Sequence, residues 1–313
     1  MTTWRTWLKE DLLLFSLLFT TPERRLRKLY DAFSHNYFTE KSHFLNLGYW
    51  KDSPDTLDAA CEALANLVAE AGEFKSSDEI LDAGFGLGDQ DLFWMEHFSP
   101  QSIVGLNIAP SQVEFARRRA AERGLEGRLK FQVGSATEVP FGPESFDKVV
   151  ALESAFHFNT RAVFFKEAFR VLRPGGRLVT ADLVAMPPRE GVDRSALKYR
   201  AIRLFTRVSQ SLMPSPPAND YARDAYARKM EEAGFVNVRV ETIREEVFAP
   251  FIRYLTRRLH DADIKRRINP GMRRLCQNVV SKPDRSLVNA IVNNSDYIIA
   301  TGDKPAPPSA EAP

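Results

Sequence analysis

Cysteine is scarce in this sequence, and the two that occur lie far apart. Cys61 and Cys276 stand among 313 residues, and neither belongs to a short metal or redox spacing. Small secreted domains that rely on disulfides carry many closely spaced cysteines. A disulfide framework is therefore excluded, and a reducing, cytoplasmic location fits. No cluster of histidine, cysteine and acidic residues has metal-ligand spacing either, so we expect no metal site.

Strong net charge and long hydrophobic runs are also lacking. Forty-three basic and 41 acidic residues leave a net charge of +2, so no overall field favours nucleic acid as a partner. The apolar run at residues 12–19 is too short to span a bilayer. Glu10 and Asp11 precede it and no small-residue cleavage site follows, so a signal peptide is not expected. Residues 1–20 could lie in a membrane interface as a peripheral contact, or pack on the domain or on a partner subunit.

What the sequence does have is an ordinary globular composition and one glycine-rich turn. It contains 44% hydrophobic and 27% charged residues, and its length suffices for one large domain with insertions. Residues 79–83 predict a short buried strand, and residues 89–98 predict a helix. Between them, Gly84, Gly86 and Gly88 leave the backbone N–H groups of a helix N-terminus open to a ligand. A turn without a ligand is the alternative, but the entropic cost of three glycines favours a binding role.

Two kinds of ligand use such a turn. A dinucleotide-binding turn, Gly-x-Gly-x-x-Gly, would place its third glycine at position 89, where this chain has Asp89. Such domains also present an acid to the ribose hydroxyls after the next strand, where this chain has Asn107. Asparagine can still accept one hydrogen bond and donate another, but without the charge. An NAD-dependent oxidoreductase is therefore disfavoured.

Strand and helix patterns alternate after the turn. Before the turn, helices are predicted over residues 22–33 and 57–71. After it, strands are predicted at residues 102–108, 130–136, 146–154, 177–184, 235–243 and 296–301, and helices from Pro110 and over residues 161–171. Pro174 ends the second of these helices, and the Gly175–Gly176 pair turns the chain into the next strand. This alternation predicts a parallel sheet covered by helices on both faces.

Over residues 79–185 these segments resemble the class I S-adenosylmethionine (SAM)-dependent methyltransferases of small molecules, of the natural-product and tocopherol type. The motifs that carry the resemblance are Asp-x-Gly-x-Gly-x-Gly from Asp82, Phe-Asp-x-Val from Phe146 and Val-Leu-Arg-Pro-Gly-Gly from Val171. The resemblance implies an α/β fold with a Rossmann-like, doubly wound, mostly parallel seven-stranded sheet and SAM as cofactor. It also implies an N-terminal helical lid and a helical cap insertion before the last strand.

The resemblance assigns cofactor-binding roles to the turn and to the strand ends beside it: Asp82, Gly84, Phe85, Gly86, Gly88, Asn107, Ile108, Gln112, Ser135, Ala136 and Glu153. Members often carry an acid at the position of Ser135, so the adenine contact is expected from backbone or from Ser135 and Ala136 together. Aromatic residues are expected to line the lid and substrate site: Tyr30, Tyr37, Tyr49, Trp50 and Phe156. A ring near a sulfonium gains cation–π attraction, and ordinary packing is the alternative for Tyr49 and Trp50.

Methyl transfer to a hydroxyl needs close positioning of the reacting atoms and a group that takes the hydroxyl proton. The natural place for that group is just past the fourth strand, at the carboxyl edge where ligands collect. The chain there has the segment Glu153-Ser-Ala-Phe-His157. His157 is the candidate base because its intrinsic pKa suits neutral pH, and Glu153 is a candidate catalytic or substrate-site carboxylate. The alternatives are a packed or capping His157 and a solvated strand end at Glu153.

We expect a lid at residues 1–56, a SAM-binding core at 57–185, the rest of the core with caps (186–220 and 245–294) at 186–303, and a disordered tail at 304–313. The predicted function is SAM-dependent methyl transfer to a small, largely apolar acceptor, by O-methylation of a natural-product hydroxyl in secondary metabolism. The alternatives are C- or N-methylation of a membrane lipid, quinone or sterol-like molecule, a dinucleotide-dependent oxidoreductase and a SAM-binding scaffold without catalysis. Nucleic acid is not an expected substrate, since no Asn-Pro-Pro-Tyr-type tetrapeptide is present. The sequence leaves the oligomeric state open, with a dimer among the options.

Overall fold

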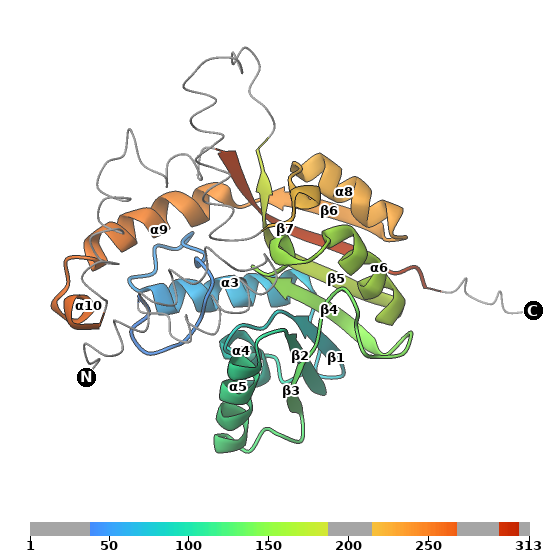
Figure 1. Cartoon of the computed structure of the whole chain (residues 1–313), viewed down its shortest axis with the longest axis horizontal. Coiled ribbons are helices and arrows are strands. Elements are labelled where there is room, and N and C mark those ends of the chain that lie inside the picture. Colours follow the sequence, from blue (N-terminus) through green and yellow to red (C-terminus); the bar gives the residue numbers. More distant parts are fainter. Residues whose placement is uncertain (1–37, 187–214, 268–293, 307–313) are drawn as a thin grey trace, which may run out of the picture.

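A seven-stranded sheet forms the centre of the computed structural model, which describes residues 38–186, 215–267 and 294–306 (Figure 1). The strands are β1 (Glu79–Ala83), β2 (Ser102–Asn107), β3 (Leu129–Val133), β4 (Phe146–Leu152), β5 (Leu172–Ala185), β6 (Val236–Thr242) and β7 (Ser295–Asp303). Their order is β3-β2-β1-β4-β5-β7-β6. Strands β1 to β5 run parallel, and β7 lies antiparallel between β5 and β6. The predicted mostly parallel, Rossmann-like sheet is confirmed.

Helices cover both faces of this sheet (Figure 1). They are α3 (Leu57–Ala71), α4 (Asp89–His97), α5 (Pro110–Glu122), α6 (Arg161–Val171), α8 (Arg223–Glu232), α9 (Arg244–Arg258) and α10 (Ala262–Arg267). Buried side chains of α3, α4, α5 and α9 join one apolar cluster with one face of the sheet. Those of α6 and α8 join a second cluster with the opposite face. Two apolar layers therefore enclose the strands, as the alternating pattern predicts.

Local signals in the sequence set several of the helix ends. The Thr56 side chain accepts a hydrogen bond from the Ala59 N–H (3.2 Å) and caps α3. Pro110 occupies the first turn of α5, where its missing N–H costs no helical hydrogen bond. The helices predicted over residues 57–71 and 161–171 have the bounds that the sequence predicts, because cap and apolar spacing agree there.

Strand β5 begins five residues earlier than the sequence predicts. Leu172 pairs with Phe146, and the next pairing in register joins Arg177 to Lys148, so the residues between them bulge out of the ladder. Gly176 lies in this bulge, where a Cβ atom would come within 2.8 Å of the Asp147 carbonyl oxygen. The proline–glycine sequence therefore forms a bulge at the start of the strand rather than a turn that precedes it.

The strand order places a ligand site at one edge of the sheet. Strand β1 pairs with β2 on one side and with β4 on the other, so the chain direction across the sheet reverses at β1. Crevices at such a switch point, outside the carboxyl ends of the strands, are where ligands of open α/β sheets bind. The glycine turn after β1 and the segment after β4 both lie at this edge.

Several predicted segments lie outside the described residues: the helix expected within residues 22–33, the basic stretch at 187–214, residues 268–293 and the final residues from 307. Helices α9 and α10 form the beginning of the helical insertion expected at 245–294. Residues 1–20, for which membrane contact and packing on the domain or a partner subunit are the alternatives, also lie outside the described residues. None of the helices in the described ranges combines the length and apolar character that crossing a bilayer requires.

Candidate functional site

The turn between β1 and α4 requires glycine for its backbone conformation. Gly84 has φ of 90° and Gly86 has φ of 60°, both in the left-handed region that side chains disfavour. A Cβ atom on Gly84 would also lie 2.4 Å from the Cβ of Ser154, whose hydroxyl donates to the Ala83 carbonyl (2.6 Å). The turn therefore packs directly against the segment that follows β4, and this contact joins the two halves of the site.

The segment from residue 38 to residue 56, which we call the entry segment, lies across this turn. The side chain of Leu45 lies above Gly86, where it would meet an added Cβ atom at 3.1 Å. Three carboxylates accept backbone N–H groups from the entry segment: Asp58 from residues 40–42, Asp89 from His43 and Glu153 from Leu47. The segment is thus fastened to α3, to α4 and to the end of β4.

The aromatic residues expected in the lid have different surroundings. Trp50 is buried, donates its indole N–H to the Leu47 carbonyl (2.9 Å), and packs on Tyr254 of α9 with ring centroids 5.1 Å apart. Tyr49 is partly buried, and burial, with Glu246 and Asp52 nearby, raises its pKa. Tyr30 and Tyr37 lie outside the described residues, so the substrate role of all four stays a prediction.

Two buried carboxyl groups face each other beneath the turn. Asp82, the residue before the last in β1, has no exposed surface; Gln90 donates to its Oδ2 (3.1 Å), and no hydrogen bond to its Oδ1 is formed within the described ranges. Asp91 of α4 is equally buried and interacts with Asp82. Burial raises the pKa of Asp82 to about 7 and that of Asp91 well above its ordinary value. The pair therefore holds a proton at neutral pH.

Asp91 was not among the residues that the sequence singled out. The sequence does show that Asp91 is an acidic residue in the first turn of the helix after the glycine turn, close to the core residues Leu92 and Met95. Acidic residues are common in the first turn of a helix because their negative charge interacts favourably with the helix dipole. The sequence alone therefore does not distinguish a buried acid at this position from an exposed one. The contact between Asp91 and Asp82 is seen only in the structure.

Asn107 at the end of β2 braces the glycine turn. Its Nδ2 donates to the Gly86 carbonyl (3.2 Å) and to Oε1 of Gln112 (2.8 Å), and its Oδ1 accepts from the Ala109 N–H (3.1 Å). A carboxylate has no N–H to donate and would repel the Gly86 carbonyl. This geometry explains why an amide stands where related turns carry an acid, and it leaves Oδ1 one further lone pair for a ligand.

The ends of β2 and β3 expose apolar side chains. Ile108, which follows β2, is 38% exposed, and Val133, the last residue of β3, is 52% exposed. Ser135 follows, with its hydroxyl 2.9 Å from that of Thr137. Exposed apolar side chains can pack on the faces of a flat heterocyclic ring, and hydroxyl groups beside them can form hydrogen bonds with its edge. The sequence does not predict a role for Val133, because it predicts a strand that continues to residue 136, whereas β3 ends at Val133.

Two predicted cofactor residues have side chains in the core. Phe85 has no exposed surface and packs on Phe131 with ring centroids 4.5 Å apart. Ala136 is buried in the cluster on the opposite face of the sheet. Any contact that Phe85 or Ala136 makes with a ligand therefore comes from the backbone.

Glu153 lies directly after β4 in a left-handed conformation, with φ of 48°. Its Oε1 accepts hydrogen bonds from the hydroxyl of Tyr297 on β7 (2.6 Å) and from the Leu47 N–H (2.7 Å). Burial raises the pKa of Glu153 to about 7, and these two donors limit the increase. A carboxyl group with this pKa can both accept and release a proton near neutral pH.

His157 lies in the short 3-10 helix η1 (Ala155–His157), at the same edge of the sheet as Glu153. It is buried, its ring centroid lies 3.9 Å from that of Phe156, and its backbone N–H donates to the Ser154 carbonyl (3.0 Å). The structure therefore brings both predicted catalytic residues onto one short loop beside the glycine turn. Their catalytic roles stay predictions.

Both insertions join the described structure near this loop. The N–H of Met186, where residues 187–214 begin, donates to the Asn294 carbonyl (2.8 Å), where residues 268–293 end. Ser215, at the other end of the first insertion, donates its hydroxyl to the Phe156 carbonyl (2.8 Å). Three residues that border these insertions, Met186, Ser215 and Asn294, therefore lie at the carboxyl edge of the sheet.

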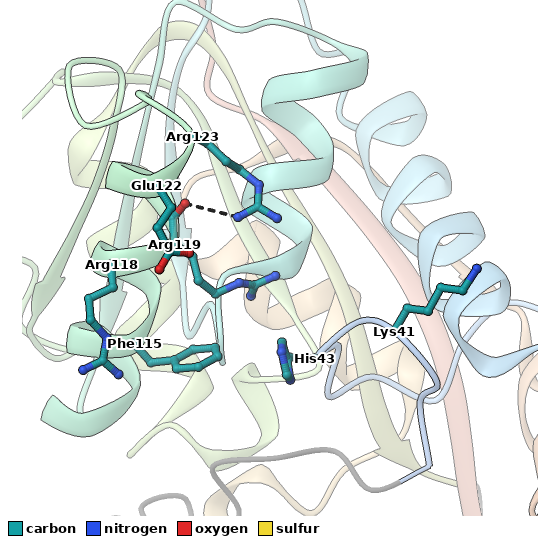
Figure 2. A pocket seen from close by; sticks show the side chains of 7 residues that line it. All are labelled: Lys41, His43, Phe115, Arg118, Arg119, Glu122 and Arg123. Atoms are coloured by element: carbon teal, nitrogen blue, oxygen red, sulfur yellow. Dashed lines mark hydrogen bonds between the residues drawn. The ribbon is translucent and has the colours of Figure 1, made fainter.

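A basic pocket of about 290 Å³ lies beside the turn, between the entry segment and α5 (Figure 2). Its lining residues are Lys41, His43, Phe115, Arg118, Arg119, Glu122 and Arg123. Arg119 pairs with both oxygens of Asp89 (2.5 and 2.9 Å) and also donates to the Leu87 carbonyl (3.0 Å). The positive charge of Arg119 is thus largely neutralised by Asp89, and its side chain holds the turn through the Leu87 carbonyl. Within the described ranges, no three histidine, cysteine or acidic side chains converge to hold a metal ion.

Comparison with known proteins agrees with this geometry. The methyltransferase domain family matches residues 81–180. The chain is 39% identical over 289 residues to erythromycin 3''-O-methyltransferase of Saccharopolyspora erythraea, covering 91% of each chain. It is 34% identical over 175 residues to 27-O-demethylrifamycin SV methyltransferase of Amycolatopsis mediterranei, covering 56% of this chain and 64% of that one. A geranyl diphosphate methyltransferase solved with SAM has the same fold, with a TM-score of 0.59, 20% identity and coverage of 80% and 87%.

Proposed function

This chain belongs to the class I SAM-dependent methyltransferases of small molecules, and we propose that it methylates a hydroxyl group of a small, largely apolar natural product. The observation that carries the proposal is the 39% identity, over 91% of both chains, to a protein named for O-methylation of erythromycin. Similarity over that length extends well beyond residues 81–180, which match the methyltransferase domain family. An acceptor of the size and character of erythromycin is therefore the first one to test.

The residues at the turn fit a cationic nucleoside cofactor. The carboxyl pair of Asp82 and Asp91 lies buried beneath the turn, and a positive charge nearby would favour its ionised form. The glycine turn, Asn107 Oδ1, Ile108 and Ser135 would hold the nucleoside between apolar surfaces and hydrogen-bonding groups. When bound, SAM supplies a methyl group on a positively charged sulfur that a nucleophile can take.

The chain's own part in the reaction is to place the acceptor hydroxyl and to take its proton. His157 would accept that proton, because it lies on the loop after β4, at the carboxyl edge of the sheet. Glu153 would hold the entry segment through Leu47 and place a carboxylate beside the acceptor. Burial of this edge by the entry segment excludes water and so favours transfer to the acceptor.

An acceptor screen tests the proposed function. The purified protein is incubated with isotope-labelled SAM and a panel of hydroxylated polyketides, phenols, amines and prenyl lipids, and products are identified by mass spectrometry. We expect labelled product with a hydroxylated polyketide. Labelled product from amines or prenyl lipids alone would contradict the proposal.

Replacing His157 tests the proposed base. His157→Ala should lower kcat by about 10²- to 10⁴-fold, the usual contribution of a general base, while the Kd for SAM changes little. His260→Ala is the matched control, because His260 is an exposed histidine beyond α9. Unchanged kcat in His157→Ala would remove this residue from the mechanism.

A further inference from the structure

A buried polar network anchors the loop that carries His157. Arg161, the first residue of α6, is 1% exposed, and its Nε donates to Oδ2 of the fully buried Asp182 on β5 (2.7 Å). Its other N–H groups donate to the carbonyls of Asn219 (2.5 Å) and Leu183. A buried guanidinium needs hydrogen-bond partners, and each of the three nitrogens of Arg161 has one here.

Asn219 connects this network to the loop. It ends the short 3-10 helix η2 (Pro217–Asn219), close to the return point of the first insertion, and it is 3% exposed. Its Nδ2 donates to the carbonyls of Phe156 (3.2 Å) and Phe158 (2.8 Å), and its Oδ1 accepts the Arg161 N–H (2.9 Å). One amide group therefore holds the backbone on both sides of His157.

The same loop is also held from the sheet. The Phe156 N–H donates to Oδ1 of Asp182 (3.1 Å), so the backbone of Phe156 is fixed through its N–H by Asp182 and through its carbonyl by Asn219. Asp182 also accepts from the Tyr226 hydroxyl (3.3 Å). His157 follows Phe156 directly, so the position of its ring depends on a backbone that side chains hold at both ends.

From these contacts we propose that Asn219 is a positioning residue for the methyl transfer reaction, which it supports by fixing the loop around His157. The inference rests on the proposed function, in which His157 takes the acceptor proton. In the described structure the side-chain hydrogen bonds of Asn219 go to Phe156, Phe158 and Arg161, and none of them goes to the glycine turn. It has instead the hydrogen bonds that a positioning role needs: two donors on the flanking carbonyls and one acceptor on the start of α6.

The test replaces Asn219 with aspartate. The change keeps the side-chain shape, but it sets carboxylate oxygens against two carbonyls and so displaces the loop. Asn219→Asp should lower kcat by about 10- to 100-fold, as displacement of a catalytic group by about 1 Å does, with the Kd for SAM within about twofold of wild type. Asn237→Asp is the matched control: Asn237 is exposed on β6 and donates to Asp303 (3.1 Å) rather than to this loop, and the variant should keep wild-type kcat.

A double-mutant cycle separates positioning from a general structural role. If Asn219 acts through His157, then Asn219→Asp should change kcat by less than about threefold in the His157→Ala background. An equal loss in both backgrounds, or a parallel loss of SAM binding and kcat, would overturn the proposal. If Asn219→Asp does not fold, Asn219→Ser, which keeps one hydroxyl donor, should show the same pattern at smaller size. Wild-type turnover in His157→Ala alone would refute the proposed base instead, so the two failures are distinguishable.

Discussion

Tyr297 donates its phenolic hydroxyl to Glu153 across 2.6 Å and so joins the last strand of the sheet to the carboxyl end of β4. The same Glu153 oxygen accepts the Leu47 N–H from the entry segment. One carboxylate oxygen thus connects three parts of the chain that meet beside the glycine turn. Because burial raises the pKa of Glu153 to about 7, the charge at this junction changes within the pH range where enzymes commonly work.

Removing the Tyr297 hydroxyl should shift the pH dependence of turnover upward. A donor to a carboxylate stabilises the charged form, so Tyr297→Phe should raise the pKa of Glu153 further above about 7. If ionised Glu153 is required, kcat rises with pH through this pKa, and in Tyr297→Phe the rise should occur at higher pH. Glu153→Gln, which cannot ionise, should lack the rise. A profile of kcat against pH that is the same in all three proteins would contradict this role.

Gly86→Asp should abolish SAM binding while leaving the protein folded. The side chain would fill the turn beneath Leu45, and aspartate tolerates the left-handed φ of 60° better than most residues do. Gly124→Asp is the matched control, because Gly124 has φ of 65° and nothing within 4 Å of an added Cβ atom. Calorimetric titration with SAM measures both. Normal affinity in Gly86→Asp would contradict the placement of the cofactor.

Asp91→Asn should stabilise the protein at neutral pH. Folding raises the pKa values of the Asp82–Asp91 pair, so the folded state binds more protons than the unfolded state. The contribution of this pair to the free energy of unfolding is therefore largest below the ordinary aspartate pKa, and it is lost as the pH rises from about 4 to about 7. Asparagine should reduce that loss, which is on the order of 4 kcal/mol for a carboxyl whose pKa rises from about 4 to about 7, and should flatten the dependence of the free energy of unfolding on pH.

Urea unfolding at acidic and at neutral pH measures this effect. Asp89→Asn is the control two residues away, since it weakens the pair with Arg119 and should destabilise at neutral pH. Equal destabilisation by Asp91→Asn at both pH values would show that the carboxyl pair does not hold a shared proton.

Asp58→Asn should loosen the entry segment. Partial burial opposes ionisation of Asp58, but the backbone N–H groups of residues 40–42 outweigh burial and hold its pKa below the ordinary value. A carboxyl group with a lowered pKa stabilises the fold above its unfolded pKa, and this contribution is lost as pH falls through its folded pKa. The variant should lose about 1 kcal/mol at neutral pH and bind SAM more weakly.

The loss in Asp58→Asn should shrink in acid, where wild-type Asp58 is itself protonated. Thermal unfolding at the two pH values gives the comparison. Asp55→Asn, at an exposed acid just before α3, is expected to have no effect. A loss in Asp58→Asn that is as large in acid as at neutral pH would contradict the role of its charge.

The order of strands and helices could be predicted from the sequence because its signals are local. Pro110 marks the start of α5, and the apolar spacing of α3 and α6 gives their lengths. The glycine turn could be predicted for the same reason, since Gly84 and Gly86 are needed by the backbone of that segment itself. Strand β5 differs because its first residue, Leu172, pairs with Phe146 across a bulge that no local pattern reveals.

The supporting contacts of the site could not be predicted, because they join residues far apart in the chain. Tyr297 meets Glu153 from the last strand, and Asn219 meets the loop around His157 from beyond an insertion. The sequence shows that Asn107 stands where an acid is expected. Only the structure shows that its amide donates a hydrogen bond to the Gly86 carbonyl. Each of these roles depends on which strands are neighbours, and spacing along the sequence does not carry that information.

The most direct test of the account is to find the atom that receives the methyl group. Wild-type protein and Gly86→Asp are each given SAM with an isotope-labelled methyl group and the acceptor that the screen identifies, and the product is examined by NMR. The account predicts a labelled methyl group bonded to oxygen with the wild type and no product with Gly86→Asp. A methyl group on carbon or nitrogen, or undiminished transfer by Gly86→Asp, would contradict it.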